Sequence, residues 1–272
     1  MRIHWIAAFA ALVALGGCES QNQPAADAAA QAPAIAPGTA ITGTITLRDP
    51  IPVAAGARLQ LRLADAAQPE PPVAEKTIEV TGAPPYSFSL DFERTRINAG
   101  RTYVLDARLT DGDRRFLPAL SSPVLTHGAG ASVQVVLTAE ATPAEKLKEE
   151  YGKLQGRIGG MKKVAGAYTT DTSSVAWDAF AEGSSVRFVR VNTELDAGGR
   201  SAVYYAFTKD GKPMMVAHKG GAMVGWGENG DVLVNEKPGG GEVAAADAAS
   251  MRETALKALA QAQEKVDAGK KK

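Results

Sequence analysis

The chain of 272 residues contains a single cysteine, Cys18, and aromatic residues make up only 6% of it. One cysteine allows no intramolecular disulfide, so the fold must rest on its hydrophobic core. The formal net charge is zero, which removes the bulk field that draws proteins to nucleic acid. Basic residues interleaved with aromatic ones, a pattern typical of nucleic-acid surfaces, are also missing. We therefore expect no nucleic-acid partner. After one apolar run near the N-terminus there is no second long one, so we expect no membrane contact besides the one that this N-terminal region provides.

The apolar run has the features of a secretory signal peptide. Arg2 supplies a positive charge, the run from Trp5 to Leu15 is almost uninterrupted, and the small residues Gly16 and Gly17 follow. A run of about eleven residues is too short to cross a bilayer core, which needs about 20 helical residues. The sequence therefore predicts a signal peptide over residues 1–17.

Leu15-Gly16-Gly17-Cys18 resembles a lipobox, the processing motif of bacterial lipoproteins. This resemblance implies cleavage between Gly17 and Cys18 and attachment of diacylglycerol to the Cys18 thiol, usually with acylation of the new amine. Two or more acyl chains make a stable membrane anchor. Glu19 differs from the aspartate that favours inner-membrane retention in enteric bacteria. We therefore expect a lipid anchor on the periplasmic side of the outer membrane, with the inner membrane as the alternative.

Beyond the cysteine, residues 18–39 consist mostly of Ala, Gln and Pro and cannot bury enough apolar surface to fold. We expect a flexible tether there. Residues 40–138 then alternate between apolar and polar side chains, a pattern typical of half-buried strands. Asp111-Gly112 suits the tip of a hairpin, while Pro118 and Pro123 mark an edge strand or its interruption. Several short strands at this spacing predict a β-sandwich; the predicted strands are 41–47, 59–63, 86–92, 103–109 and 133–137.

The order of these segments resembles the YbaY/YscW-type lipoprotein family. The matching stretches are Ile41 to Arg48, Ala57 to Asp65, Pro85 to Leu90 and Pro123 to Thr126, all behind a lipobox. The resemblance covers about residues 40–138 and implies a small β-sandwich on a lipid anchor. Some relatives are pilot proteins for the outer-membrane ring of a type III secretion system. The family offers no catalytic residues, and the C-terminal half of the chain lies outside the resemblance.

A helical period begins after the sandwich. Thr142-Pro143-Ala144-Glu145 is a capping box with proline at the first helical position. It predicts a helix over residues 143–158, within a linker over 139–164.

Alternation returns between residues 175 and 236, where Lys209 to Lys212 suits a hairpin turn. A second capping box at Ser250 to Glu253 predicts a helix to about Val266, with an apolar stripe of Ala255, Leu256, Leu259 and Val266. We expect a small α+β domain over 165–268, made of an antiparallel sheet and a C-terminal helix, and a tail over 269–272. The chain is thus predicted to be mainly β. The predicted strands of this domain are 175–181, 185–195, 202–209, 213–218 and 232–236.

The sequence motifs that could belong to a catalytic, cofactor or metal site have structural interpretations. Gly225 to Gly230 matches the dinucleotide-binding expression, but the strand-like Asp231 to Val234 follows where a helix is required, so we expect a hairpin loop. After signal cleavage only two histidines remain, His127 and His218, too few to propose a zinc site. No nucleophile elbow or P-loop occurs. A catalytic triad built from residues far apart in the sequence is recognised by its geometry, and no sequence pattern here indicates one. We expect no catalytic residue, metal or cofactor.

Aromatic residues concentrate in the C-terminal half. Tyr204 and Tyr205 are adjacent in a predicted strand, so they point to opposite faces and one of them is expected to face outward. Together with Trp226 they form a possible interface, because exposed aromatics anchor protein contacts. Core packing is the alternative that accounts for most of the aromatic set.

Three features favour a protein that binds a partner and does not catalyse a reaction. They are the predicted lipid anchor, the family resemblance and the lack of a recognisable cluster of catalytic residues. We expect a pilot-like assembly factor for an envelope component, with an envelope protein as its partner. Two alternatives stay open: an envelope enzyme or enzyme inhibitor that uses the C-terminal domain, and a passive structural lipoprotein.

Overall fold

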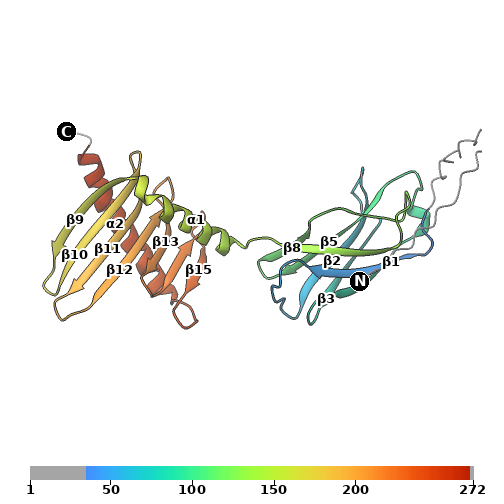
Figure 1. The fold of residues 1–272 in the computed structure, drawn as a ribbon, viewed down its shortest axis with the longest axis horizontal. Helices are drawn as coiled ribbons and strands as arrows, with labels where there is room; N and C mark the ends of the chain where they lie inside the picture. Colours follow the sequence, from blue (N-terminus) through green and yellow to red (C-terminus); the bar gives the residue numbers. More distant parts are fainter. Residues whose placement is uncertain (1–34, 270–272) are drawn as a thin grey trace, which may run out of the picture.

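The computed structural model describes residues 35–269 and folds them around two β-sheets at opposite ends of an elongated molecule (Figure 1). The predicted signal peptide, Cys18 and most of the predicted tether lie outside the described residues. No helix in residues 35–269 has the length and apolar character needed to cross a membrane.

The N-terminal sheet contains eight strands in the order β3-β2-β5-β6-β8-β1-β4, with β7 paired to β5. β1 runs parallel to β8, and the other pairs are antiparallel. The β5–β6 hairpin turns at Asp111-Gly112, as predicted. The strands are β1 (Ala40–Leu47), β2 (Ala57–Asp65), β3 (Ala74–Val80), β4 (Tyr86–Asp91), β5 (Tyr103–Asp111), β6 (Arg114–Pro118), β7 (Ser122–Val124) and β8 (Ser132–Ala139); a short 3₁₀ turn, η1 (Arg94–Arg96), follows β4.

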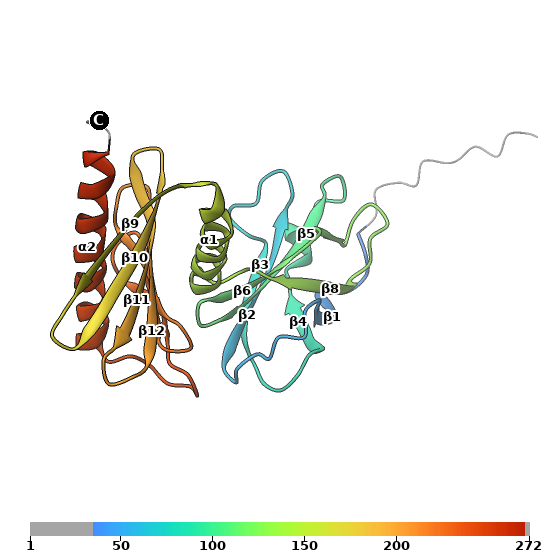
Figure 2. The same cartoon turned by 60° about the vertical axis from the view of Figure 1, so that its left-hand side comes forward.

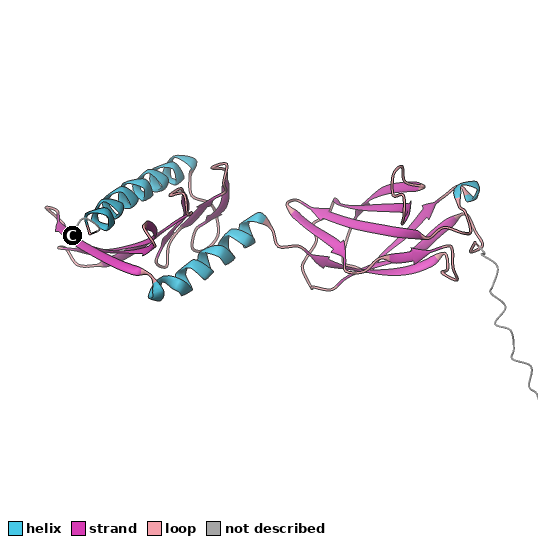
Figure 3. Cartoon of the chain, turned by 90° about the horizontal axis from the view of Figure 1, so that it is seen from above, coloured by secondary structure: helices cyan, strands magenta, loops and turns pink. Residues whose placement is uncertain are grey.

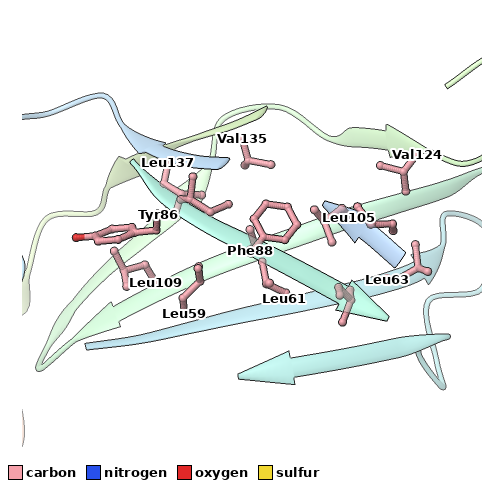
Figure 4. Packing of buried hydrophobic residues seen from close by; sticks show 14 of the residues in the cluster. Leu59, Leu61, Leu63, Tyr86, Phe88, Leu105, Leu109, Val124, Val135 and Leu137 are labelled. Carbon is pink, nitrogen blue, oxygen red and sulfur yellow. The ribbon is translucent and has the colours of Figure 1, made fainter. Parts of the chain in front are cut away.

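This sheet curls over a core that comes from the alternating apolar residues of its strands. Leu59, Leu61 and Leu63 of β2 and Phe88 of β4 point into the same interior (Figure 4). Curling brings the two outer strands, β3 and β4, close together. The Lys76 ammonium of β3 donates to the carbonyl oxygen of Ser89 in β4 at 2.9 Å. The predicted β-sandwich is therefore one sheet closed nearly into a barrel, with its halves facing each other.

The helix α1 (Pro143–Arg157) begins at the predicted capping box. The Thr142 hydroxyl accepts from the Glu145 amide at 3.2 Å, and the Glu145 carboxylate accepts from the Thr142 amide at 2.9 Å. These bonds satisfy backbone donors that no helical carbonyl can reach. A 3₁₀ turn, η2 (Ile158–Gly160), then leads into the second sheet.

The C-terminal sheet is an antiparallel meander of seven strands in the order β15-β14-β13-β12-β11-β10-β9. Each strand pairs with its neighbour in sequence, as short hairpin connections require. The strands are β9 (Lys162–Thr169), β10 (Ser173–Glu182), β11 (Ser185–Leu195), β12 (Arg200–Phe207), β13 (Pro213–His218), β14 (Met223–Trp226) and β15 (Val232–Glu236).

A helix covers each face of the C-terminal sheet. The long helix α2 (Ala245–Ala268) packs on one face, and α1 packs on the other, between the two sheets (Figures 2 and 3). Leu147, Tyr151 and Leu154 of α1 are buried against this sheet. The helix interpreted from sequence as a linker thus also forms a layer of the C-terminal unit.

The C-terminal helix begins five residues earlier than Ser250. Its first turn has no side-chain cap; the Asn235 side chain instead holds the preceding loop by two hydrogen bonds to the backbone of Val243. The buried stripe is Ala248, Ala255, Ala262 and Val266, so small side chains let the helix approach the sheet closely. Of the predicted stripe, Leu256 is 45% exposed. Ala255 and Val266 of the predicted stripe are buried and Leu259 packs against the same core, so only Leu256 departs from it. The start differs from the sequence prediction because tertiary contacts replaced the second capping box.

Several strands gave no usable sequence signal. β3 and β9 are edge strands with mostly exposed side chains, so their apolar alternation is weak. β14 has four residues and lies in a glycine-rich stretch. Lys162 and Lys163 stand at the start of β9. Charged side chains on an edge strand protect its free edge from aggregation.

One ion pair connects the two units. Arg114 at the start of β6 donates to the Glu145 carboxylate of α1 at 2.5 Å and to the Glu140 carbonyl oxygen at 3.3 Å. The Arg114 bond, aided by the bond from the Thr142 amide, lowers the pKa of Glu145 to about 2 from an ordinary value of 4.5. Glu145 thus caps α1 and links it to the N-terminal sheet.

This linkage predicts a specific pH dependence. Since the folded pKa of Glu145 lies below its unfolded value, its stabilising contribution is present above about pH 4.5 and is lost as the pH falls toward 2. Glu145→Gln removes the contribution, so we expect its thermal midpoint to lie below that of wild type near neutral pH and to converge with it toward pH 2. Melting curves across this range test the expectation, with exposed Glu150→Gln on the same helix as the control. A constant difference between the two midpoints would contradict it.

Candidate functional site

The segment that joins the predicted tether to the N-terminal sheet is held by Arg94. Its guanidinium donates to the carbonyl oxygens of Ala36 at 2.7 Å and of Ile35 and Gly38 at 3.3 Å each. The Ala36 amide also donates to the Leu125 carbonyl oxygen at 2.6 Å. Four hydrogen bonds therefore fix where the chain enters the N-terminal sheet.

The loop that receives this segment is backbone-strained. Leu125 and His127 have φ angles of 69° and 54°, a left-handed conformation that is uncommon outside glycine. Leu125 is fully buried, and its amide donates to the Gly130 carbonyl oxygen at 3.0 Å. The buried hydroxyl of Thr126 has no hydrogen-bond partner among the described residues. Burial and backbone bonding hold the loop in shape where the tether begins.

Chain entry and exit lie at opposite ends of the N-terminal sheet. β1 and β8 are parallel, so the start of β1 and the end of β8 are separated by the length of these strands. The eight residues of β8 span roughly 26 Å. The C-terminal unit therefore leaves from the end away from the tether, as Figure 1 shows.

A prominent apolar side chain on the N-terminal unit is Leu120, in the connection between β6 and β7. Its side chain is 82% exposed. Pro118, the last residue of β6, and Pro123, the middle residue of β7, stand on either side of it.

A comparison with known families identifies the part of the chain that has recognised relatives. Residues 36–137 match the family described as type III secretion system lipoprotein chaperone (YscW). This match confirms the resemblance drawn from residues 40–138. It ends before α1, so the YscW-like region is the N-terminal sheet together with the segment that Arg94 holds.

Other comparisons add little. No curated protein matches the chain. A solved structure described as an alternative pilotin from the type II secretion system of Vibrio cholerae is similar at 22% identity and a TM-score of 0.35. That similarity covers 38% of this chain and 96% of the other. At this score it supports no argument about function.

The three predicted interface aromatics lie in or beside the core of the C-terminal unit. Tyr205 and Trp226 are 6% and 4% exposed and pack on the α2 side. Tyr204 is half-buried on the α1 side, where its ring stacks on Phe188 with centroids 6.2 Å apart. The two tyrosines do point to opposite faces, but a helix covers each face. Burial thus accounts for Tyr205 and Trp226 as packing residues.

The glycine motif and the histidines fall in loops and at strand ends. Gly225 and Trp226 end β14, and Gly227 to Gly230 lie in the turn to β15, where the Gly227 amide donates to the Asp231 carbonyl oxygen at 2.9 Å, as in a hairpin. His127 and His218 are both exposed, in separate units. Within residues 35–269 no group of three or more His, Cys, Asp or Glu side chains is placed to hold a metal. Gly17 and Cys18 lie outside the described residues.

Proposed function

We propose that this protein is a lipoprotein, anchored through Cys18 on the periplasmic side of the outer membrane, that acts as a pilot-like assembly factor for an envelope component. The observation that carries the proposal is the match of residues 36–137 to the secretion-system lipoprotein chaperones. This region stands directly behind the predicted tether, which links it to the lipid.

The arrangement of the chain supports this role. A tether of about 20 residues has an end-to-end distance of roughly 25 Å, enough to hold the YscW-like region clear of the lipid head groups. Arg94 fixes the point where the tether meets this region. The tether therefore reaches the N-terminal sheet at one defined end, and the remaining surface is free for an envelope protein.

The role requires binding and no reaction. In this proposal the YscW-like region contacts the envelope component directly, with Leu120 as one apolar contact, and no residue acts as a catalyst. The C-terminal unit lies at the far end of the sheet, where it can contact other molecules without competing for the same surface.

The test is affinity capture from detergent-solubilised envelopes with the tagged full-length chain. We expect wild type to recover the same envelope protein reproducibly, and Leu120→Asp to lose most of it, because a charge replaces an exposed apolar contact. Leu256→Asp is the matched control, since Leu256 is exposed on α2 of the other unit. Recovery of no specific envelope protein by wild type would refute the proposed role. Equal loss in both variants would refute the contact at Leu120.

A further inference from the structure

The face of the C-terminal sheet that carries α1 is only partly covered. Its covered part is a row of paired residues across four strands, packed under Leu147, Tyr151 and Leu154 of α1. Beyond α1, the ends of β9 to β12 extend without a helix on this side (Figure 1). The covered row is Phe180, Phe188, Ala206 and Met215.

Small side chains form a second row in the uncovered part. Ala167, Ala176, Asn192 and Ala202 are direct partners across β9, β10, β11 and β12. Three of them are exposed and Ala202 is half-buried. Their methyl groups and one amide make a low floor beside the longer side chains of Glu194 and Arg200.

The flanking rows complete a trough. The row on the outer side is Thr169, Ser174, Glu194 and Arg200, and the row toward α1 is Ala165, Asp178, Arg190 and Tyr204. These rows lie roughly 13 Å apart, and four strands span roughly 14 Å across them. The hollow over the floor and the outer row, with Lys219 at one end, has a volume of about 850 Å³, and the row toward α1 lies beyond its lining. It runs across the strands, so a molecule lying in it does not extend the sheet by strand pairing.

Positive charge exceeds negative charge around the trough. The Asp178 carboxylate accepts from Lys163 at 2.8 Å and from Arg190 at 2.5 Å. Burial raises the pKa of Asp178, but these two bonds outweigh burial and hold it below its ordinary value, so the carboxylate stays charged. Glu194 pairs with Arg200 at 2.9 Å.

Lys219 lines the hollow beside Ala202 and has no carboxylate partner among residues 35–269. The charged residues that line the hollow are therefore two cations, Arg200 and Lys219, and one carboxylate, Glu194, and the charge of Lys219 is left uncompensated.

We propose that this trough binds an acidic segment of a partner polypeptide. Small apolar side chains of the segment rest on the alanine floor, and its carboxylates face Arg200 and Lys219. The exposed Asn192 amide can both donate to and accept from a peptide group. The trough lies outside residues 36–137, so this inference does not depend on the function proposed above.

The test pans a random dodecapeptide library on the full chain carrying Cys18→Ser, which removes the lipid site and leaves both units intact. We expect enrichment of peptides rich in Asp and Glu. Binding of a selected peptide should weaken about tenfold or more with Ala176→Trp, because the indole fills the floor. Lys219→Glu should weaken it several-fold, more at low salt than at high salt, because it reverses a facing charge.

Ala260→Trp on the exposed face of α2 is the matched control and should bind as wild type does. Circular dichroism melts of each variant confirm that the fold is retained. The proposal is overturned if no peptide is enriched, if the enriched peptides are not acidic, or if Ala176→Trp binds them unchanged. It is also overturned if phosphatidylglycerol vesicles, and no peptide, bind wild type in a manner that Ala176→Trp abolishes; the occupant is then an anionic lipid.

Discussion

Gly43→Ala is expected to destabilise the N-terminal unit strongly and to lower its unfolding midpoint. Gly43 lies in β1 between Phe88 of β4 and Val133 of β8. A Cβ atom there would overlap the carbonyl oxygen of Val133 and approach the Phe88 ring to 3.1 Å. Backbone cannot yield as a flexible side chain can, so the parallel β1–β8 pair must separate. Overpacking costs about 1–3 kcal/mol and occasionally more. Because the clash here is with backbone, we expect a loss of about 3 kcal/mol, a large part of the stability of a domain.

Urea unfolding followed by circular dichroism measures this effect, with two controls. Thr42→Ala alters an exposed residue of the same strand and should shift the midpoint little. Gly152→Ala lies in α1, where an added Cβ meets nothing within 4 Å, and should stabilise the helix by roughly 0.5–1 kcal/mol. An unchanged midpoint for Gly43→Ala would mean that β1 and β8 do not pair as described.

Cys18→Ser is expected to move the protein from the membrane fraction to the soluble periplasm. The proposed anchor consists of acyl chains on Cys18, and each buried methylene contributes about 0.8 kcal/mol to membrane binding. Serine has no thiol to receive diacylglycerol, so this variant loses all of that energy. Both folded units should stay intact, because residues 35–269 contain no cysteine.

Membrane fractionation beside wild type, with the intact mass of the mature chain, measures the change. Lipid on the wild-type chain in the outer-membrane fraction supports the proposal. Two soluble proteins without lipid would refute the lipobox interpretation and remove the main support for a pilot-like role.

Local patterns predicted most of the elements correctly where both local preference and tertiary packing favoured the same structure. The alternation in β2 and β4 matches their buried faces. The capping box at Thr142 forms both of its hydrogen bonds. Edge strands such as β3 and β9 were missed because an edge buries little, so its sequence need not alternate.

The C-terminal helix shows where a local signal is overridden. Ser250 and Glu253 carry the spacing of a capping box, yet they lie inside α2. Alanine favours helix strongly, and Asn235, from β15, fixes the loop ahead of Ala245. A contact across the fold therefore set the start of the helix.

The sequence by itself determined the mainly β fold class, the resemblance of residues 40–138 to the YscW family and the hairpin nature of Gly225 to Gly230. These follow from period, order and spacing along the chain. Only the tertiary structure decided that α1 covers the C-terminal sheet, that Tyr205 and Trp226 are buried, and that Ala167, Ala176, Asn192 and Ala202 form one floor. The reason is physical: strand register aligns residues far apart in sequence, and no local pattern encodes which helix will cover them.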